Sequence, residues 1–193
     1  MREAIETLRR AIEASEGPAP AVGLADPKRR WPGGVVVYEI TFRSYADRIR
    51  EAMALWTQGT NIEFRERTNE AAWVDIRPGD YTQSHVGYLG TPQALEIHEG
   101  TSTVGIIAHE LGHTLGLFHE QTRADRDRFI EVVWDNIYPE AQGQFASSPE
   151  AEDIGDYDYD SIMHYPMVAF ALDPQRPTLK PRLDGVSIGQ RNG

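Results

Sequence analysis

The sequence predicts an α+β fold for the 193-residue chain. The first 117 residues contain both helical spacing and short β-branched runs, whereas the chain from residue 118 onward is rich in loops. Hydrophobic residues make up 40% of the chain, which is enough for a sizeable core in one domain or in two small lobes. The sequence shows no internal repeat.

The N-terminal elements alternate between helix and strand. Residues 2–15 have the apolar spacing of an amphipathic helix, and residues 17–27 contain three prolines and are typical of a linker. A turn at WPGG then leads into a β-branched strand over residues 35–42. The stretch 44–58 predicts a helix, with Ser44 as its N-cap.

Further elements follow in the middle of the chain. Residues 62–67 and 71–78 are typical of short strands, and residues 85–90 of an extended segment. A helix is expected from Thr103 to Leu117, ending near Gly116. Beyond it, a short strand and a turn are expected within residues 125–140, and residues 147–166 should be mostly irregular.

Composition excludes several classes of partner and site. The net charge of −11 argues against nucleic acid or an anionic membrane as partner. No apolar run approaches the roughly 20 residues that span a bilayer. The first residues lack the apolar core of a secretory signal, which could have been removed. With no cysteine, a metal must be bound by histidine, carboxylate, tyrosine or water.

The stretch HELGHTLGLFH, residues 109–119, contains three of the six histidines. His109 and His113 are four residues apart, so a helix places them on one face, where two imidazoles can bind one zinc ion. Glu110 follows the first histidine and suits a general base. Gly116 permits a backbone reversal that returns His119 to the same metal.

This pattern predicts one Zn²⁺ ion per chain, with water at the fourth position. Zinc lowers the pKa of that water to about 7, and Glu110 would accept its proton and pass it to the leaving amine. The alternative is a buried helix with incidental histidines. The five fixed positions would match by chance on the order of once in 10⁵ chains of this length, so we favour the metal site.

A second landmark is SIMHY, residues 161–165, which lies downstream of the histidines. The two motifs together resemble the metzincins, zinc proteases that have a methionine turn. The flanking stretches HEQTRADRDRFI, YDYDSIMHY, RRWPGGVVVYEI and IGQRNG are similar to the astacin family in particular. The resemblance runs over residues 23–193, which leaves residues 1–22 as an N-terminal extension.

The resemblance implies a two-lobed protease fold with a cleft between the lobes. The lobe of about residues 23–119 would have a twisted, mostly parallel sheet and the active-site helix. The lobe of about residues 120–193 would be irregular and contain the Met-turn. The implied zinc ligands are His109, His113 and His119.

The resemblance also implies roles for residues around the metal. Glu110 would be base and acid, and Tyr165 would be a switchable ligand whose hydroxyl stabilises the oxyanion. Met163 would form the floor beneath the imidazoles. Glu120 is the glutamate towards which the family's freed N-terminus folds.

Substrate contacts follow from the same resemblance. The segment from Val86 to Gly90 would be an edge strand that pairs with an extended polypeptide, with Tyr88 and Leu89 in contact with it. Family members often favour an acidic residue after the scissile bond, and the basic candidates here are Arg176, Lys180 and Arg182. The alternative for these three is a solvated basic loop.

The sequence departs from the family pattern in three places. Asn61, Thr101 and a residue near Thr82 stand where cysteines are expected. The C-terminal helix of the family is missing, which suggests truncation after IGQRNG. Residues 1–22 are either a propeptide remnant that packs passively on the surface, or an extension that lowers activity because it prevents a free N-terminus near residue 23 from reaching Glu120.

We therefore expect a secreted, monomeric zinc endopeptidase, and the short loops without cysteine favour a bacterial origin. One rival is a serralysin-like metzincin, against which Glu120 and the stretch RADRDRF argue. The other is a zinc-binding module that has lost catalysis, against which the presence of Glu110 argues.

Overall fold

The computed structural model describes residues 21–191, so the helix expected at residues 2–15 lies outside the described residues. The chain divides into two compact units. Within the described residues, the first unit contains Asp26–Leu117 with Arg191, and the second contains residues 21–25 with Phe118–Gln190.

A five-stranded sheet forms the centre of the first unit. Its strand order is β3-β2-β4-β6-β5, where β2 is Val35–Ile40, β3 is Glu63–Glu66, β4 is Val74–Pro78, β5 is Gln83–Ser84 and β6 is Gln93–Ile97. The pairs β2–β3, β2–β4 and β4–β6 are parallel, and only β5 runs antiparallel to its neighbour. The prediction of a mostly parallel sheet is therefore confirmed.

Strand β6 is missing from the sequence-based prediction. Its side chains alternate, because Gln93, Leu95 and Ile97 are buried and the two residues between them are less so. This period of two is the ordinary sign of a strand with one face in the core. The predicted strands at 35–42, 62–67 and 71–78 exist, but each is shorter in the structure.

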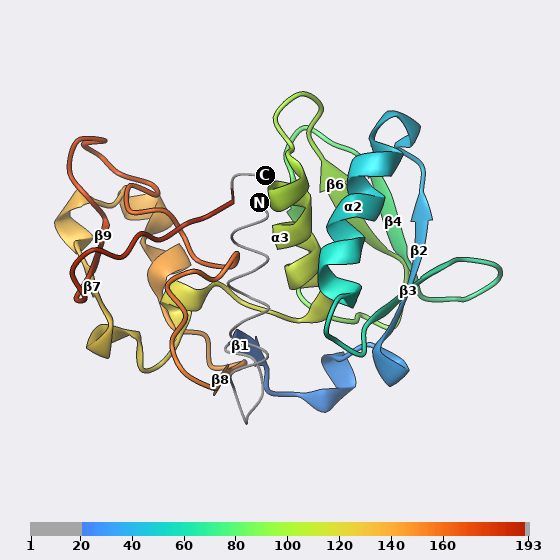
Figure 1. Cartoon of the computed structure of the whole chain (residues 1–193), viewed down its shortest axis with the longest axis horizontal. Helices are drawn as coiled ribbons and strands as arrows, with labels where there is room; N and C mark the ends of the chain where they lie inside the picture. The colour runs from blue at the N-terminus through green and yellow to red at the C-terminus, as the bar shows by residue number, and fades with distance from the viewer. Residues whose placement is uncertain (1–20, 192–193) are drawn as a thin grey trace. The chain divides into compact units, whose positions relative to one another are not determined.

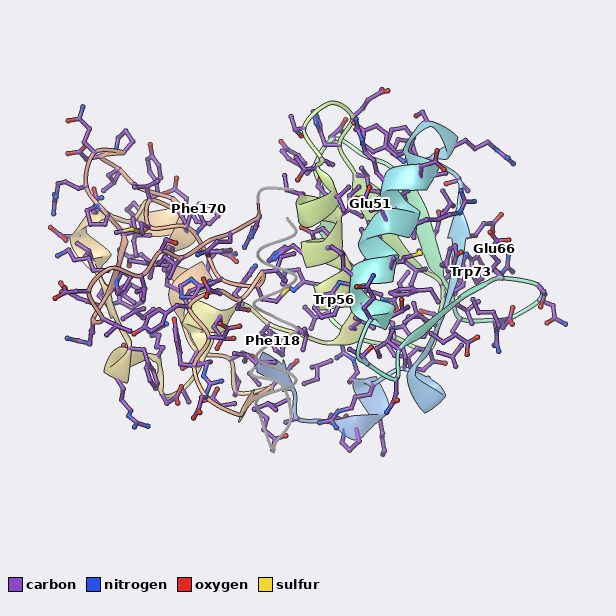
Figure 2. All side chains as sticks on the ribbon, viewed as in Figure 1. Glu51, Trp56, Glu66, Trp73, Phe118 and Phe170 are labelled. Carbon is purple, nitrogen blue, oxygen red and sulfur yellow. The ribbon has the colours of Figure 1, made fainter. Side chains whose placement is uncertain are left out.

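Two helices, α2 (Ala46–Thr57) and α3 (Val104–Leu115), contact each other in this unit. Figure 1 shows α2 in front of the sheet with α3 beside it. The Trp56 indole N–H of α2 donates to the Ala108 carbonyl of α3 at 2.8 Å (Figure 2). The predicted Ser44 cap is wrong, because a 3-10 turn at Arg43–Tyr45 precedes α2 and Tyr45 occupies its N-cap position.

The second unit consists mainly of 3-10 turns and loops, as expected for the C-terminal half. Strand β7 (Ile130–Val132) pairs antiparallel with β9 (Leu179–Pro181). The core of the second unit contains aliphatic and aromatic side chains: Ile130, Ile137, Ala141, Phe145, Tyr157, Tyr165, Leu179 and Ile188.

A second strand pair in this unit differs from the prediction. Strand β1 (Ala21–Leu24) falls in the expected linker, and it pairs antiparallel with β8 (Ala151–Ile154), which falls in the segment expected to be irregular. Val22 and Leu24 are buried, so hydrophobic burial fixes a stretch whose prolines suggested a linker. None of the helices over residues 21–191 is long and apolar enough to cross a membrane.

Candidate metal centre

The ends of α3 are set by its own sequence. The Thr103 hydroxyl accepts the Ile106 amide proton at 3.2 Å and caps the N-terminus. Gly116 adopts the left-handed conformation with φ 104°, and its amide bonds the carbonyls of Gly112 and His113. Since a side chain at this φ would crowd the backbone, glycine is the residue that can end the helix here.

The helix holds two histidines together and its end brings a third to them. The ring centroids of His109 and His113 are 4.6 Å apart. One ligand nitrogen from each of His109, His113 and His119 lies within 4.8 Å of the other two, and among the described residues no other histidine or carboxylate group gathers in this way.

This donor set fits zinc. Tetrahedral zinc with Zn–N bonds of about 2.0–2.1 Å places its nitrogen ligands about 3.3–3.4 Å apart. Three imidazole nitrogens within 4.8 Å of one another are compatible with such an ion. Since three protein nitrogens leave a fourth position open, the set is of the catalytic rather than the closed structural type.

His113 is held in the tautomer that a metal requires. Its Nδ1 lies 2.8 Å from the Leu117 carbonyl oxygen, which can only accept, so Nδ1 carries the proton and Nε2 is free of one. Burial lowers the pKa of His113 from 6.5 to about 4, so the ring is neutral at pH 7. A neutral ring is the state that binds a cation.

Glu110 is a buried carboxylate in the same helix, with 8% of its surface exposed. Burial raises the pKa of Glu110 from 4.5 to about 7, opposed by the charge of Arg191 and by a hydrogen bond from the Ser84 backbone. A carboxylate whose pKa lies close to neutral pH suits proton transfer in both directions.

Strand β5, which pairs with β6 on one side, is tied to α3 at the position of Glu110. The hydroxyls of Ser84 and Thr114 are 2.7 Å apart, and Thr114 in turn donates to the Glu110 carbonyl at 3.2 Å. The sheet edge is therefore connected through Ser84 and Thr114 to the main chain of α3 at Glu110.

The predicted edge strand from Val86 to Gly90 is wrong. The edge strand is β5, Gln83–Ser84, two residues upstream. Gly87 and Gly90 have φ values of 73° and 74°, which are incompatible with a continuous strand.

Backbone groups of this segment are also used within the protein. The Arg29 side chain donates to the carbonyls of Val86 and Tyr88, at 2.7 and 3.2 Å, and the Tyr88 amide bonds the Arg29 carbonyl. The Leu89 amide donates to the Gln93 side chain at 3.1 Å. Tyr88 and Leu89 therefore lie on a loop held by these hydrogen bonds, and their contact with substrate stays a prediction.

In the second unit, Glu120 follows His119 and is fully buried. Its Oε1 accepts the Asp158 amide proton at 3.1 Å and lies 3.6 Å from the Arg123 guanidinium. Its Oε2 has no hydrogen-bond partner among the residues described. Burial raises the pKa of Glu120 from 4.5 to about 8.

Arg123 is a buried hub that sequence reasoning missed. It pairs with Asp125 at 2.8 Å, and its other guanidinium nitrogens donate to the carbonyls of Ala21 and of residues 154–156. It thereby connects Glu120 to both strands of the β1–β8 pair. The sequence around Arg123, residues 122–125, does not indicate burial, because arginine is usually exposed.

The SIMHY turn lies in the second unit with Glu120. Met163 is buried, and its carbonyl accepts the Glu120 amide proton at 3.2 Å. The Tyr165 ring lies 4.3 Å from the His119 ring, and its amide donates to the buried Gln121 side chain at 3.1 Å. The turn therefore places Tyr165 beside one of the three histidines.

His164 is a second residue that the sequence prediction did not single out. It is fully buried, with Nδ1 2.8 Å from the Tyr165 carbonyl and Nε2 2.6 Å from the Tyr157 hydroxyl. Burial also raises the pKa of Tyr157. The histidine connects the turn to the aromatic core of this unit.

The basic candidates for substrate recognition are ion-paired at the surface. Arg176 lies 3.0 Å from Asp135, and Lys180 lies 3.3 Å from Glu131, with all four side chains well exposed. Arg182 donates to the Asp127 carbonyl. The preference for an acidic residue after the scissile bond stays a prediction.

A hydroxyl pair occupies one expected disulfide position. The Thr82 and Ser102 side-chain oxygens are 2.6 Å apart, and each also bonds the His98 backbone, at 3.0 and 2.9 Å. Thr101 instead bonds the His98 ring. Thr82 therefore bonds Ser102, the residue after Thr101.

Comparison with known proteins decides the family. The model of the astacin family of peptidases matches residues 23–193. The chain belongs to the astacin family. This membership and the α+β fold are the predictions made from the zinc motif, the Met-turn and their flanks, and both are confirmed.

Several astacins resemble the chain closely. Astacin-like metalloprotease toxin 1 of Loxosceles intermedia is 44% identical over 165 residues, which cover 82% of this chain and 62% of the toxin. Zinc metalloproteinase nas-15 of Caenorhabditis elegans is 40% identical over 171 residues, covering 84% of this chain and 30% of that protein. The chain thus spans less than two thirds of these relatives.

A solved structure agrees with the fold. High choriolytic enzyme 1, a hatching enzyme zinc-protease from Oryzias latipes, superposes with a TM-score of 0.76 at 36% sequence identity. The match covers 85% of this chain and 86% of the hatching enzyme.

Proposed function

We propose that this astacin is a zinc-dependent endopeptidase that hydrolyses polypeptides. The observation that carries the proposal is the cluster of three histidines, with the buried carboxylate of Glu110 directly after the first of them. His109, His113 and His119 would hold a zinc ion, which would lower the pKa of a bound water molecule to about 7 and polarise a scissile carbonyl.

In this proposal the chain's own groups move the protons and bind the developing charge. Glu110, the buried carboxylate directly after His109, accepts a proton from the attacking water and passes it to the leaving amine. The Tyr165 hydroxyl donates to the oxyanion that forms from the carbonyl. Met163 and Gly116 have structural roles, because Met163 is buried and its carbonyl accepts the Glu120 amide proton, and Gly116 ends α3.

We propose that an extended substrate pairs with β5, Gln83–Ser84. Within the described residues β5 has a strand neighbour on one side only, and sheet edges bind extended peptides by backbone hydrogen bonds. The Ser84–Thr114 contact fixes this edge against the helix of Glu110, which favours a constant spacing between a paired peptide and the base.

Domain limits and location are proposed on the same basis. Residues 23–193, which the family model matches, would form the catalytic domain, and residues 1–22 the extension. Astacin-like metalloprotease toxin 1 of Loxosceles intermedia, one of the relatives, supports a secreted protein.

The test is Glu110→Gln, which keeps the shape and removes the base. Zinc content should stay at one per chain while casein cleavage falls by about 10²–10⁴-fold, the usual contribution of a positioned base. Glu99→Gln, an exposed glutamate between β6 and α3, is the matched control and should leave activity unchanged. Near wild-type cleavage by Glu110→Gln at full zinc content would overturn the assignment.

A further inference from the structure

Phe170 has an unusual backbone. It is the single non-glycine residue with positive φ in the described part of the chain, at 53°. An L side chain avoids this region because its Cβ crowds the neighbouring carbonyl. Such strain persists only where the surroundings enforce it, and it commonly marks a functional position.

Hydrogen bonds from two neighbouring segments hold the backbone of Phe170 in this conformation. Backbone and side-chain hydrogen bonds hold residues 167–172 between the 136–138 segment and Thr178. They run from Tyr138 N–H to Phe170 O at 3.0 Å, from Leu172 N–H to Asn136 O at 2.8 Å, from Thr178 N–H to Met167 O at 2.7 Å and from Thr178 Oγ1 to Ala169 O at 2.8 Å. Thr178 and Asn136 are buried, so this clamp is rigid.

Burial of the Phe170 ring does not explain these hydrogen bonds, because the residue is 45% exposed. Its ring instead contacts Tyr165, with centroids 5.6 Å apart and planes tilted by 50°. Phe145 contacts both rings, at 5.7 Å from Tyr165 and 6.2 Å from Phe170. The Tyr165 ring also contacts the His119 ring, with the two ring centroids 4.3 Å apart.

We propose that Phe170 is a positioning residue for Tyr165. The clamped loop presents the Phe170 ring as a fixed wall, and Phe145 forms a second wall at right angles to it. Together they confine the Tyr165 ring to the side of His119, so that its hydroxyl is preorganised instead of sampling other rotamers. The proposal rests on the proposed role of Tyr165, and Phe170 acts only through Tyr165.

The test is Phe170→Ala in the zinc-loaded full chain, assayed with a peptide substrate. The variant removes the ring and keeps the backbone clamp. The interaction free energy of such an aromatic pair corresponds to a rate change of about 3- to 10-fold. We therefore expect kcat to fall by about 3- to 10-fold, with KM little changed. Leu172→Ala, an equally exposed apolar residue of the same loop, is the control and should keep kcat within about twofold.

A double-mutant comparison separates positioning from a general structural effect. In the Tyr165→Phe background no hydroxyl is left to position, so Phe170→Ala should change kcat by less than about twofold. An equal loss of kcat in both backgrounds would overturn the proposal, as would a raised KM with unchanged kcat, which would instead make Phe170 a substrate subsite.

A measurement that does not depend on catalysis tests the position of the Tyr165 ring separately from the proposed function. In NMR spectra with ¹³C-labelled tyrosine rings, the Tyr165 signal is assigned by its loss in Tyr165→Phe. Phe170→Ala should shift and broaden this signal, and an unmoved signal would overturn the proposal. If the signal moves while Tyr165→Phe keeps full kcat, the positioning stands and the catalytic role of Tyr165 fails.

Discussion

Replacing Arg123 by lysine tests the buried hub in the second unit. Arg123 makes six hydrogen bonds, two to the Asp125 carboxylate and four to main-chain carbonyls, and it is 2% exposed. Lysine keeps the charge but has only three donors. At least three bonds are lost, and buried acceptors are left unsatisfied.

Each lost bond is worth about 1 kcal/mol, so Arg123→Lys should lower the free energy of unfolding by about 3 kcal/mol. Urea unfolding at pH 7, followed by circular dichroism, measures this value. Arg128→Lys, at an exposed arginine nearby, is the control and should stay within about 0.5 kcal/mol of wild type. A loss below about 1 kcal/mol for Arg123→Lys would refute the role of the six bonds.

Two further predictions concern the Thr82–Ser102 hydroxyl pair and the buried Glu120 carboxylate. The double variant Thr82→Cys with Ser102→Cys should form a disulfide, because the native side-chain oxygens are 2.6 Å apart. Closing this loop should raise the free energy of unfolding by about 3 kcal/mol, measured with and without reductant. An unchanged melting temperature under oxidising conditions would contradict this prediction. The folded-state pKa of Glu120 is raised from 4.5 to about 8, so its contribution to stability is complete below pH 4.5 and is lost as pH rises through 8. The unfolding free energy of wild type minus that of Glu120→Gln should therefore fall between about pH 5 and pH 8.5, and a rise would show that Arg123 dominates the carboxylate.

The sequence predicts the site best where chemistry and spacing coincide. His109, Glu110 and His113 are fixed by helical geometry, and Gly116 by its φ, so their arrangement follows from local rules. Tyr165 is placed only through the resemblance of SIMHY to a known turn, because 44 residues separate its methionine from His119 and no local rule spans such a distance.

Tertiary contacts account for what the sequence does not predict. Strand β1 forms because β8 pairs with it, and that partner lies about 130 residues away. The edge strand lies two residues upstream of its predicted place, because the predicted segment includes glycines whose positive φ interrupts a strand. The burial of Arg123 and the strain at Phe170 depend on several segments at once, so no single stretch of sequence could reveal them.

The most direct measurement of the central claim is casein cleavage by the purified chain before and after zinc removal with a strong chelator. We expect one zinc per chain, complete loss of cleavage in the chelated protein, and recovery when one equivalent of Zn²⁺ is returned. His119→Ala should bind zinc more weakly and recover little, because only two imidazoles remain. Cleavage that persists in protein free of zinc, or full recovery in His119→Ala, would contradict the account.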